Sequence, residues 1–295
     1  MPQTCPIDLD ALTPIDESHG RYGKPLVYFD TKYEKTDPRM LTPKELAILL
    51  PEGQSRITAY NNVAGWKFPL RDTPQRILDY LYLGPNHAIR DLEFLRSTGI
   101  TMVLVVRNAN IFTKSFASLD RAAATLGIVG RYVDMYSPQM MLRKSLDEAV
   151  RIINDHVLSV HHAQCRGGGR ASCPTRAKVL ITCETGRMQS AFVLAAYLMA
   201  VFGLDMADAM RFIFLQRPCI IFFTDSQAIL DTWGGILKAR ASVARAGDRG
   251  DVAAKRQLGD NSDDDDVENS TSDHMDSDRF LGRRSFVPFE DKKTL

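Results

Sequence analysis

From Trp66 onward, short apolar runs alternate with longer amphipathic stretches. The apolar runs are rich in β-branched residues and end at turn residues such as Gly84-Pro85, which is typical of buried strands. The amphipathic stretches place apolar residues such as Leu146 and Val150 on one helical face. The predicted strands cover residues 77–83, 101–106, 128–133 and 179–182, and the predicted helices cover residues 91–97, 115–126, 145–161, 205–216 and 225–238, with a further helix from Ser190. Strands that alternate with helices predict an α/β domain whose helices cover the faces of a central sheet.

The segment before this domain, residues 1–65, is polar and interrupted by seven prolines. We therefore expect it to be mostly irregular. One exception is the capping box from Thr42 to Glu45, with Pro43 at the first helical position, which predicts a short helix. That helix could dock on a partner or pack on its own domain, and packing on its own domain is the more common use of such a cap.

The composition changes again beyond about Val243. The stretch 248–278 is acidic and contains no aromatic residue, so it cannot bury enough apolar surface to order itself, and we predict a disordered tail over residues 243–295. Ser262 precedes four aspartates, a suitable context for an acid-directed kinase, although a solubilising tail explains the same composition. The predicted domain therefore spans residues 66–242.

Composition and charge narrow the class of protein. The chain has 295 residues, 44% of them hydrophobic, which is enough for one domain of ordinary size with tails. A net charge of +1 gives no reason to expect nucleic acid as a partner. The five cysteines are scattered and odd in number, which fits a reducing compartment, so we expect a soluble protein of the cytoplasm or nucleus. We expect no secretory signal at the start and no membrane span, because the uncharged run 188–204 is short for a bilayer.

The candidate chemistry lies where the run 179–182 ends at Cys183, passes a short loop with Gly186, and leads into a helix from Ser190. Unpaired backbone N–H groups and the helix dipole bind phosphate readily at such a helix N-terminus. The same field lowers the pKa of a cysteine that opens the loop and makes it a thiolate nucleophile. An arginine six positions after the cysteine would fold back and donate a bidentate fork to two phosphate oxygens. In this sequence that position is Gln189.

The loop from Cys183 to Ser190 resembles the signature loop of the dual-specificity protein phosphatases, which is a cysteine, five residues, an arginine, and a serine or threonine. The resemblance extends over residues 66–237, through the lead-in ILDYLYLGP, the strand GITMVLVVR and the closing helices FGLDMADAMRFIFLQRPCI. The stretch GWKFPLRDTPQRIL and the RPCI ending are similar to the serine/threonine/tyrosine-interacting branch, whose members are pseudophosphatases. The resemblance implies a dual-specificity-phosphatase-like central sheet flanked by helices, with no cofactor and no metal.

The resemblance also implies roles for single residues. Cys183 takes the position of the nucleophile, Gly186 that of the tight turn, and Ser190 that of the hydroxyl beside the thiolate. Arg187 could supply the cation that the family's arginine provides, or it could point to solvent. The phosphate-binding loop would comprise Glu184, Thr185, Gly186, Arg187, Met188, Gln189 and Ser190, with the charge of Glu184 weakening anion binding if it faces inward.

Three positions around the loop depart from the family pattern. Gln189 replaces the arginine, Thr182 replaces the histidine before the cysteine, and Phe222-Phe223 replaces an Asn-Pro pair that contacts the loop. Glutamine can donate one neutral hydrogen bond where arginine offers a charged fork. Removing one donor to a developing oxyanion costs about 10²–10³ in rate, and the loss of a charged fork should cost at least that.

The general acid is also absent. The resemblance places it on the loop YVDMYSPQMM, where the proline-anchored match puts Tyr136 or Ser137 at the acid position. Asp134 is the nearby carboxylate, but its place suggests the end of a strand. Losing a general acid removes roughly another 10²–10⁴ in rate.

Together these losses predict turnover near background. Our main hypothesis is a pseudophosphatase that serves as a binding or scaffold protein for phosphorylated or phospho-regulated proteins. The alternative is a weak or specialised cysteine-dependent protein phosphatase that uses Cys183 with Arg187. A third hypothesis is that partners engage the tails or the outer helices and ignore the loop.

Other chemistry is less well supported by the sequence. The metal-type side chains of His161, His162, Cys165 and Cys173 match no standard zinc spacing, so we expect an incidental cluster. A sulfurtransferase-like loop would need an arginine where Met188 stands. We find no Gly-rich nucleotide loop and no interleaving of basic and aromatic residues.

Overall fold

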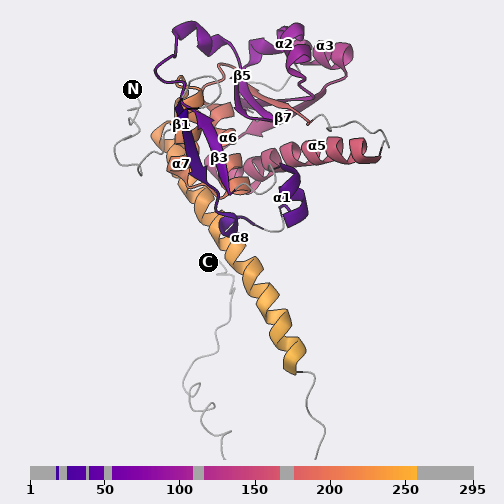
Figure 1. The fold of residues 1–295 in the computed structure, drawn as a ribbon, viewed down its shortest axis with the longest axis vertical. Coiled ribbons are helices and arrows are strands. Elements are labelled where there is room, and N and C mark those ends of the chain that lie inside the picture. Colours follow the sequence, from indigo (N-terminus) through magenta and orange to yellow (C-terminus); the bar gives the residue numbers. More distant parts are fainter. Residues whose placement is uncertain are drawn as a thin grey trace, which may run out of the picture. The chain divides into compact units, whose positions relative to one another are not determined.

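The computed structural model describes residues 18–19, 25–37, 40–49, 55–108, 116–166 and 176–257. The chain divides into two compact units, Met1–Arg249 and Gly250–Leu295. The described strands and helices lie in the first unit, except for the last turns of α8. Figure 1 shows its central sheet with helices on both faces.

The central sheet has five strands in the order β4-β5-β8-β6-β7. Four of them, β5, β8, β6 and β7, run parallel, and β4 pairs with β5 in the antiparallel direction. Parallel strands alternating with helices agree with the sequence pattern and confirm the α/β prediction. The strand bounds are Gln75–Leu78 for β4, Leu81–Pro85 for β5, Met102–Asn108 for β6, Val129–Met135 for β7 and Val179–Cys183 for β8.

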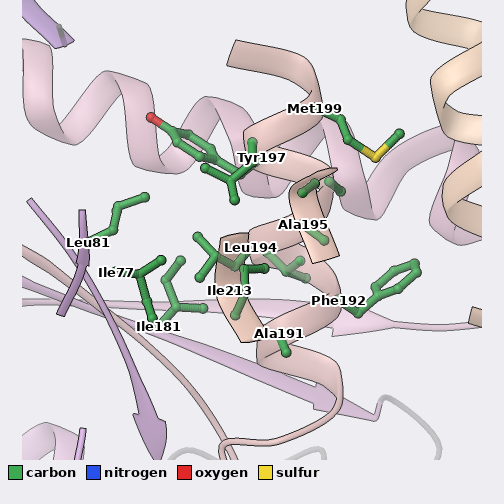
Figure 2. Packing of buried hydrophobic residues seen from close by; sticks show 14 of the residues in the cluster. Ile77, Leu81, Ile181, Ala191, Phe192, Leu194, Ala195, Tyr197, Met199 and Ile213 are labelled. Atoms are coloured by element: carbon green, nitrogen blue, oxygen red, sulfur yellow. The ribbon is translucent and has the colours of Figure 1, made fainter. Parts of the chain in front are cut away.

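Helices cover the two faces of this sheet and create two apolar cores. Successive residues of β8 face opposite ways, so Leu180 joins the smaller core with α2 and α3, and Ile181 joins the larger core with α5, α6 and α7. Figure 2 shows Leu194 of α6 and Ile213 of α7 beside Ile181 in the larger core. The helix bounds are Leu92–Thr98 for α2, Ala117–Leu126 for α3, Leu146–Arg166 for α5, Gln189–Phe202 for α6 and Met206–Gln216 for α7.

Helix α6 is the centre of the larger core. Every residue from Ser190 to Phe202 is buried, as expected for a helix that is apolar all round. Its one polar ring, Tyr197, shares a hydrogen bond of 3.0 Å with the hydroxyl of Tyr80 and donates another of 3.0 Å to Asn154 Oδ1. This burial fixes the helix whose N-terminus carries the Cys183 loop.

The N-terminal segment differs from the prediction that residues 1–65 are mostly irregular. The strands β1 (Ser18–His19), β2 (Pro25–Asp30) and β3 (Arg56–Tyr60) form an antiparallel sheet in that order. Alternate residues of β2 and β3, such as Phe29 and Ile57, are buried in the larger core, and the Phe29 ring meets the edge of Phe212 at 5.2 Å. The prolines obscured a short alternating pattern, and β2 and β3 contribute residues to the larger core.

Backbone and charge contacts fasten the N-terminal segment to the helices. Lys32 N donates to Phe202 O at 2.9 Å, and Lys32 Nζ lies 2.8 Å from Asp205 Oδ2. Gly203 adopts φ of 66°, and a Cβ there would lie 2.1 Å from Lys32 O, so this close approach requires glycine. Lys35 adds a second contact to Asp205 at 3.1 Å from the short helical turn η1 (Tyr33–Lys35).

The predicted capping box is confirmed. Thr42 N donates to Glu45 Oε2 at 2.8 Å, and Glu45 N donates to Thr42 Oγ1 at 3.3 Å, at the start of α1 (Pro43–Leu49). Leu49 is buried in the larger core. The helix therefore packs on its own domain, which is the second of the two uses considered for it.

Helix α8 (Thr224–Gln257) continues beyond residue 238, where the sequence predicts its end, and beyond the predicted boundary at residue 243. It is held by Trp233, which is fully buried and donates to Ala196 O at 3.2 Å. Arg240 adds a bidentate pair with Asp147 at 2.6 and 2.8 Å. Residues 258–295, with Ser262 and the acidic run of the predicted disordered tail, lie outside the described residues.

Candidate functional site

The loop between β8 and α6 has the strand–loop–helix layout that phosphate binding needs. β8 ends at Cys183 and α6 begins at Gln189. Gly186 adopts φ of 65°, and a Cβ there would lie 2.3 Å from the carbonyl carbon of Gly84. Only glycine allows the loop to turn this tightly against the end of β5.

The surroundings of Cys183 favour its thiolate form over that of an ordinary cysteine. Its side chain is buried, and Ser190 Oγ donates to its Sγ at 3.1 Å. Burial raises the pKa of the Cys183 thiol, but the Ser190 hydroxyl and the backbone N–H groups of Ser190, Met188 and Arg187 outweigh it, so the pKa is lowered overall. The same backbone N–H groups could donate hydrogen bonds to an anion bound in the loop.

The outer side of the loop carries acidic, basic, polar and apolar side chains. Glu184, Thr185 and Met188 are exposed, whereas Gln189 and Arg187 are half-buried. In the part of the chain that the structure describes, the buried Nε of Arg187 has no hydrogen-bond partner. The loop can thus offer one guanidinium and one amide to an anion, next to an unfavourable carboxylate.

A contact from the following segment supports the loop despite the replaced Asn-Pro pair. Ile221 N donates to Arg187 O at 2.9 Å, one residue before Phe222. Phe222 itself is buried in the larger core. The contact uses a backbone group, so the side chains at positions 222 and 223 do not decide it.

Arg217 is a further residue of the site, and the sequence pattern did not predict it. This side chain is fully buried, and its guanidinium donates to Gly186 O at 2.9 Å, to Thr73 O and Arg71 O at 2.8 Å each, and to Gln75 Oε1. Burial lowers the pKa of the Arg217 guanidinium, while the nearby Cys219 and Cys183 raise it. A single arginine within the apolar run 212–222 was the signal in the sequence.

Arg217 supports the loop from its buried side through hydrogen bonds. Four of the five N–H groups of a guanidinium are used by the hydrogen bonds just described. The side chain ties the loop to the lead-in segment that includes η2 (Phe68–Asp72). It is therefore a positioning residue and does not replace the arginine that Gln189 has displaced.

The predicted acid loop lies at the same edge of the sheet as Cys183. Met135 at the end of β7 is in register with Asn108 of β6, and Val105 of β6 is in register with Thr182. Tyr136 and Ser137 follow β7 and are exposed, just before the short helix α4 (Pro138–Met140). Neither side chain is a carboxylic acid.

The carboxylate of Asp134 is paired with Arg107. Asp134 lies within β7, and its carboxylate accepts from Arg107 Nε at 2.5 Å and from Arg107 Nη2 at 3.2 Å. Its backbone oxygen accepts from Ser145 Oγ at 2.7 Å. Both contacts fix the end of the strand, which agrees with the sequence-based placement of Asp134.

The cysteine–histidine cluster gives no metal site among the residues that the structure describes. His161 Nε2 lies 3.6 Å from Cys165 Sγ on α5, and Cys173 lies outside the described residues. Within the described ranges, no group of three or more potential metal ligands comes together. No helix among these residues is long and apolar enough to cross a membrane.

No protein-family model matches the chain. Serine/threonine/tyrosine-interacting protein B of Xenopus laevis is 28% identical over 160 residues, which cover 52% of this chain and 61% of that protein. The Homo sapiens serine/threonine/tyrosine-interacting protein is 28% identical over 163 residues, again 61% of its length. The match therefore leaves more than a third of each relative uncovered.

Solved structures of phosphatases also align with the chain. Human DUSP28 aligns over 56% of this chain and 95% of its own, with 22% identity and a TM-score of 0.38. A leucine rich repeat and phosphatase domain containing protein from Entamoeba histolytica aligns over 59% and 97%, with 16% identity and a TM-score of 0.42. The five-stranded α/β architecture agrees with the fold class that the sequence predicts, and the distant relatives of the chain include the serine/threonine/tyrosine-interacting proteins.

Proposed function

We propose that this protein is a pseudophosphatase that binds phosphorylated or phospho-regulated protein partners at the loop of residues 183–190. The observation that carries the proposal is that the loop is supported by buried hydrogen bonds, whereas the arginine and the general acid of the catalytic mechanism are replaced. Arg217 supports the loop from beneath, but Gln189 stands at the arginine position. The carboxylate nearest the acid position, that of Asp134, is held by Arg107.

The two losses affect different parts of one mechanism. The missing arginine would stabilise charge on the transferring phosphoryl group, and the missing acid would protonate the leaving oxygen. Binding needs neither step, because the backbone N–H groups of the loop and the dipole of α6 still attract an anion. The proposed function is therefore phosphate-dependent binding without turnover.

The test compares binding with turnover in the same preparations. Degenerate peptide pools carrying phosphotyrosine, phosphoserine or phosphothreonine, each with a matched unphosphorylated pool, are titrated by fluorescence polarisation. We expect at least one phosphorylated pool to bind more tightly than its match, and no hydrolysis of an aryl phosphate above background. In Cys183→Ser, binding should persist or tighten, because the thiolate charge that repels phosphate is gone.

Two outcomes would contradict the proposal in different ways. Hydrolysis that disappears in Cys183→Ser would show that the protein is an enzyme. Equal affinity for phosphorylated and unphosphorylated pools would show that partners ignore the loop, as the third hypothesis states. The matched control is Arg56→Gln, an exposed arginine of β3 that pairs with Asp30, which should change neither result.

The second candidate is a weak cysteine-dependent protein phosphatase. It is favoured by the lowered pKa of Cys183 and by Arg187, whose buried Nε has no partner among the described residues. An aryl phosphate with a good leaving group needs little help from a general acid. An ordinary thiol pKa for Cys183, measured by iodoacetamide alkylation against pH, would remove the basis of this candidate.

We further propose that the protein acts inside the cell, in the cytoplasm or nucleus. Three cysteines that the structure describes, Cys165, Cys183 and Cys219, are free thiols. A nucleophile-type cysteine in a phosphate loop needs a reducing compartment to stay reduced. Fractionation of cells that express the tagged chain tests this assignment.

A further inference from the structure

A separate cavity of about 220 Å³ lies between the N-terminal sheet and the turn that joins β4 to β5. Among the described residues that line it, none belongs to the Cys183 loop. Residues of β3, the end of α1 and the β4–β5 turn form parts of its wall. Its described lining consists of Leu49, Ile57, Thr58, Tyr60, Arg76, Ile77, Leu78, Asp79, Tyr80, Arg176, Phe202 and Gln216.

Two guanidinium groups line this cavity, and each lies over an aromatic ring. Arg176 lies 4.6 Å from the centroid of the Tyr80 ring, and Arg76 lies 5.6 Å from that of Tyr60. One carboxylate, that of Asp79, lies 3.5 Å from Arg76, and both of these side chains are about half exposed or more. The charged lining thus has a surplus of one positive charge.

Arg176 is held in place but keeps a donor unused. Its Nη2 donates to Ile48 O at 3.2 Å and to Leu49 O, both near the end of α1. Its Nε is buried and has no hydrogen-bond partner within the described ranges. A buried charged donor without an acceptor is costly, and an acceptor brought into the cavity would remove that cost.

The other residues that line the cavity are mostly apolar, and the Tyr80 hydroxyl among them already has a hydrogen-bond partner. The Tyr80 hydroxyl is used by Tyr197, and Phe202 and Leu49 are almost completely buried. Gln216 is 2% exposed, and its side-chain Nε2 donates to Phe212 O at 3.3 Å. The wall can cover a flat apolar body, and the Gln216 amide can donate to a polar edge.

We propose that this cavity binds a small aromatic carboxylate. A single negative charge matches the surplus of one positive charge, whereas a phosphate dianion would exceed it. The volume of about 220 Å³ is below the 300–1,000 Å³ of sites for larger ligands, so the ligand should be small. The carboxylate accepts from Arg176 and Arg76, and the ring packs against Tyr60 and Phe202.

The experiment uses the full chain with benzoate as the probe and benzamide as its neutral, nearly isosteric control, each titrated by calorimetry. We expect benzoate to bind and benzamide to bind at least about tenfold more weakly, because it lacks the charge that pairs with the two arginines. Phenyl phosphate serves as the dianionic comparison and should bind this cavity more weakly than benzoate.

Variants separate this cavity from the loop. Thr58→Phe fills the cavity from β3 without removing a charge and should abolish benzoate binding. Arg76→Gln removes a half-exposed charge, which the fold does not need, and should weaken benzoate about threefold to tenfold. Arg56→Gln, a neighbouring exposed arginine on β3, is the matched control and should bind benzoate like the wild type.

Several results would overturn the proposal. Equal binding of benzoate and benzamide would show an apolar cavity that does not select charge, and no binding of either would show that the cavity is not a ligand site. Benzoate binding that survives Thr58→Phe but is lost in Arg187→Gln would place the anion at the Cys183 loop. Tighter binding of phenyl phosphate that Thr58→Phe abolishes would refute the monoanion assignment.

Discussion

The Cys183 loop has a buried inner side and an exposed outer side, and the two differ in how their polar groups are used. The inner side rests on Arg217, which is fully buried and bonded to three backbone carbonyls and one side-chain amide. The outer side presents the exposed Glu184 and Met188 and a half-buried Arg187 with an unused donor. The inner side is closed to further partners, and the outer side is open to them.

Because of this difference, the residues that fix the backbone of the loop are not the residues that determine its chemistry. The inner contacts hold Gly186 in position whether or not an anion is present. The outer positions can therefore change from arginine to Gln189, or from aspartate to Tyr136 or Ser137, without collapsing the loop. A binding protein needs the inner support and an outer side that can hold an anion, and an enzyme also needs the arginine and the general acid.

The largest expected effect comes from breaking the inner side. Arg217→Met leaves the carbonyls of Gly186, Arg71 and Thr73 without their charged donor in a buried site, so the free energy of unfolding should fall by about 5 kcal/mol. Urea denaturation measures this change. Arg56→Met, at an exposed position, should change stability by less than about 0.5 kcal/mol. Should Arg217→Met not fold, Arg217→Lys, which keeps the charge but loses the fork, should still be clearly destabilised.

The next effect comes from repairing the outer side. Gln189→Arg should give slight hydrolysis of an aryl phosphate, because it restores the clamp on the phosphoryl oxygens. Adding Ser137→Asp, or Tyr136→Asp in a second protein, should raise the rate by about 10² or more. Steady-state kinetics measures both steps, and Cys183→Ser in the repaired protein is the control that should abolish them. If no combination gains activity, the loop is not shaped for phosphoryl transfer.

Most of the central fold could be predicted because its signals are local. The run before Cys183, the tight turn at Gly186 and the apolar helix from Ser190 each follow from residue type and spacing, and the structure has all three elements. The fold class is confirmed for the same reason. In contrast, β2 and β3 are separated by some 25 residues with several prolines. Their pairing depends on burial of Phe29 and Ile57 against the helices, which no local pattern reveals.

The candidate site was predictable only in part. The loop residues follow from the position of Cys183, but the role of Arg217 depends on contacts to residues 71–75 and 186, which lie far away in the sequence. The end of α8 was misplaced because the composition turns polar and acidic soon after residue 238, whereas Arg240 pairs with Asp147 of α5 beyond that point. Long-range contacts decide both cases.

A smaller effect concerns the proton on Cys183. Ser190→Ala removes the hydroxyl that donates to Sγ, so the pKa of Cys183 should rise and alkylation by iodoacetamide at neutral pH should slow by about threefold to tenfold. The folded state lowers this pKa, so its thiolate stabilises the fold above the ordinary thiol pKa, and that contribution is lost as the pH falls through the lowered value. The variant should lose part of this pH dependence in urea denaturation. An unchanged alkylation profile would mean that the backbone donors alone set the pKa.

The smallest expected effect tests whether the outer side holds an anion at all. Arg187→Gln should weaken a phosphorylated peptide about threefold to tenfold, because one partly exposed cation is lost. Glu184→Gln should tighten the same peptide by a smaller factor, because an exposed repulsive charge is removed, and the two changes should shrink in high salt. Fluorescence polarisation at two salt concentrations measures both, with the unphosphorylated peptide as the control. Since neither side chain supports the loop from beneath, thermal unfolding should be unchanged in both variants. A loss of stability in Arg187→Gln would mean that Arg187 supports the loop as Arg217 does. The assignment of Arg187 to the outer, anion-binding side would then be wrong.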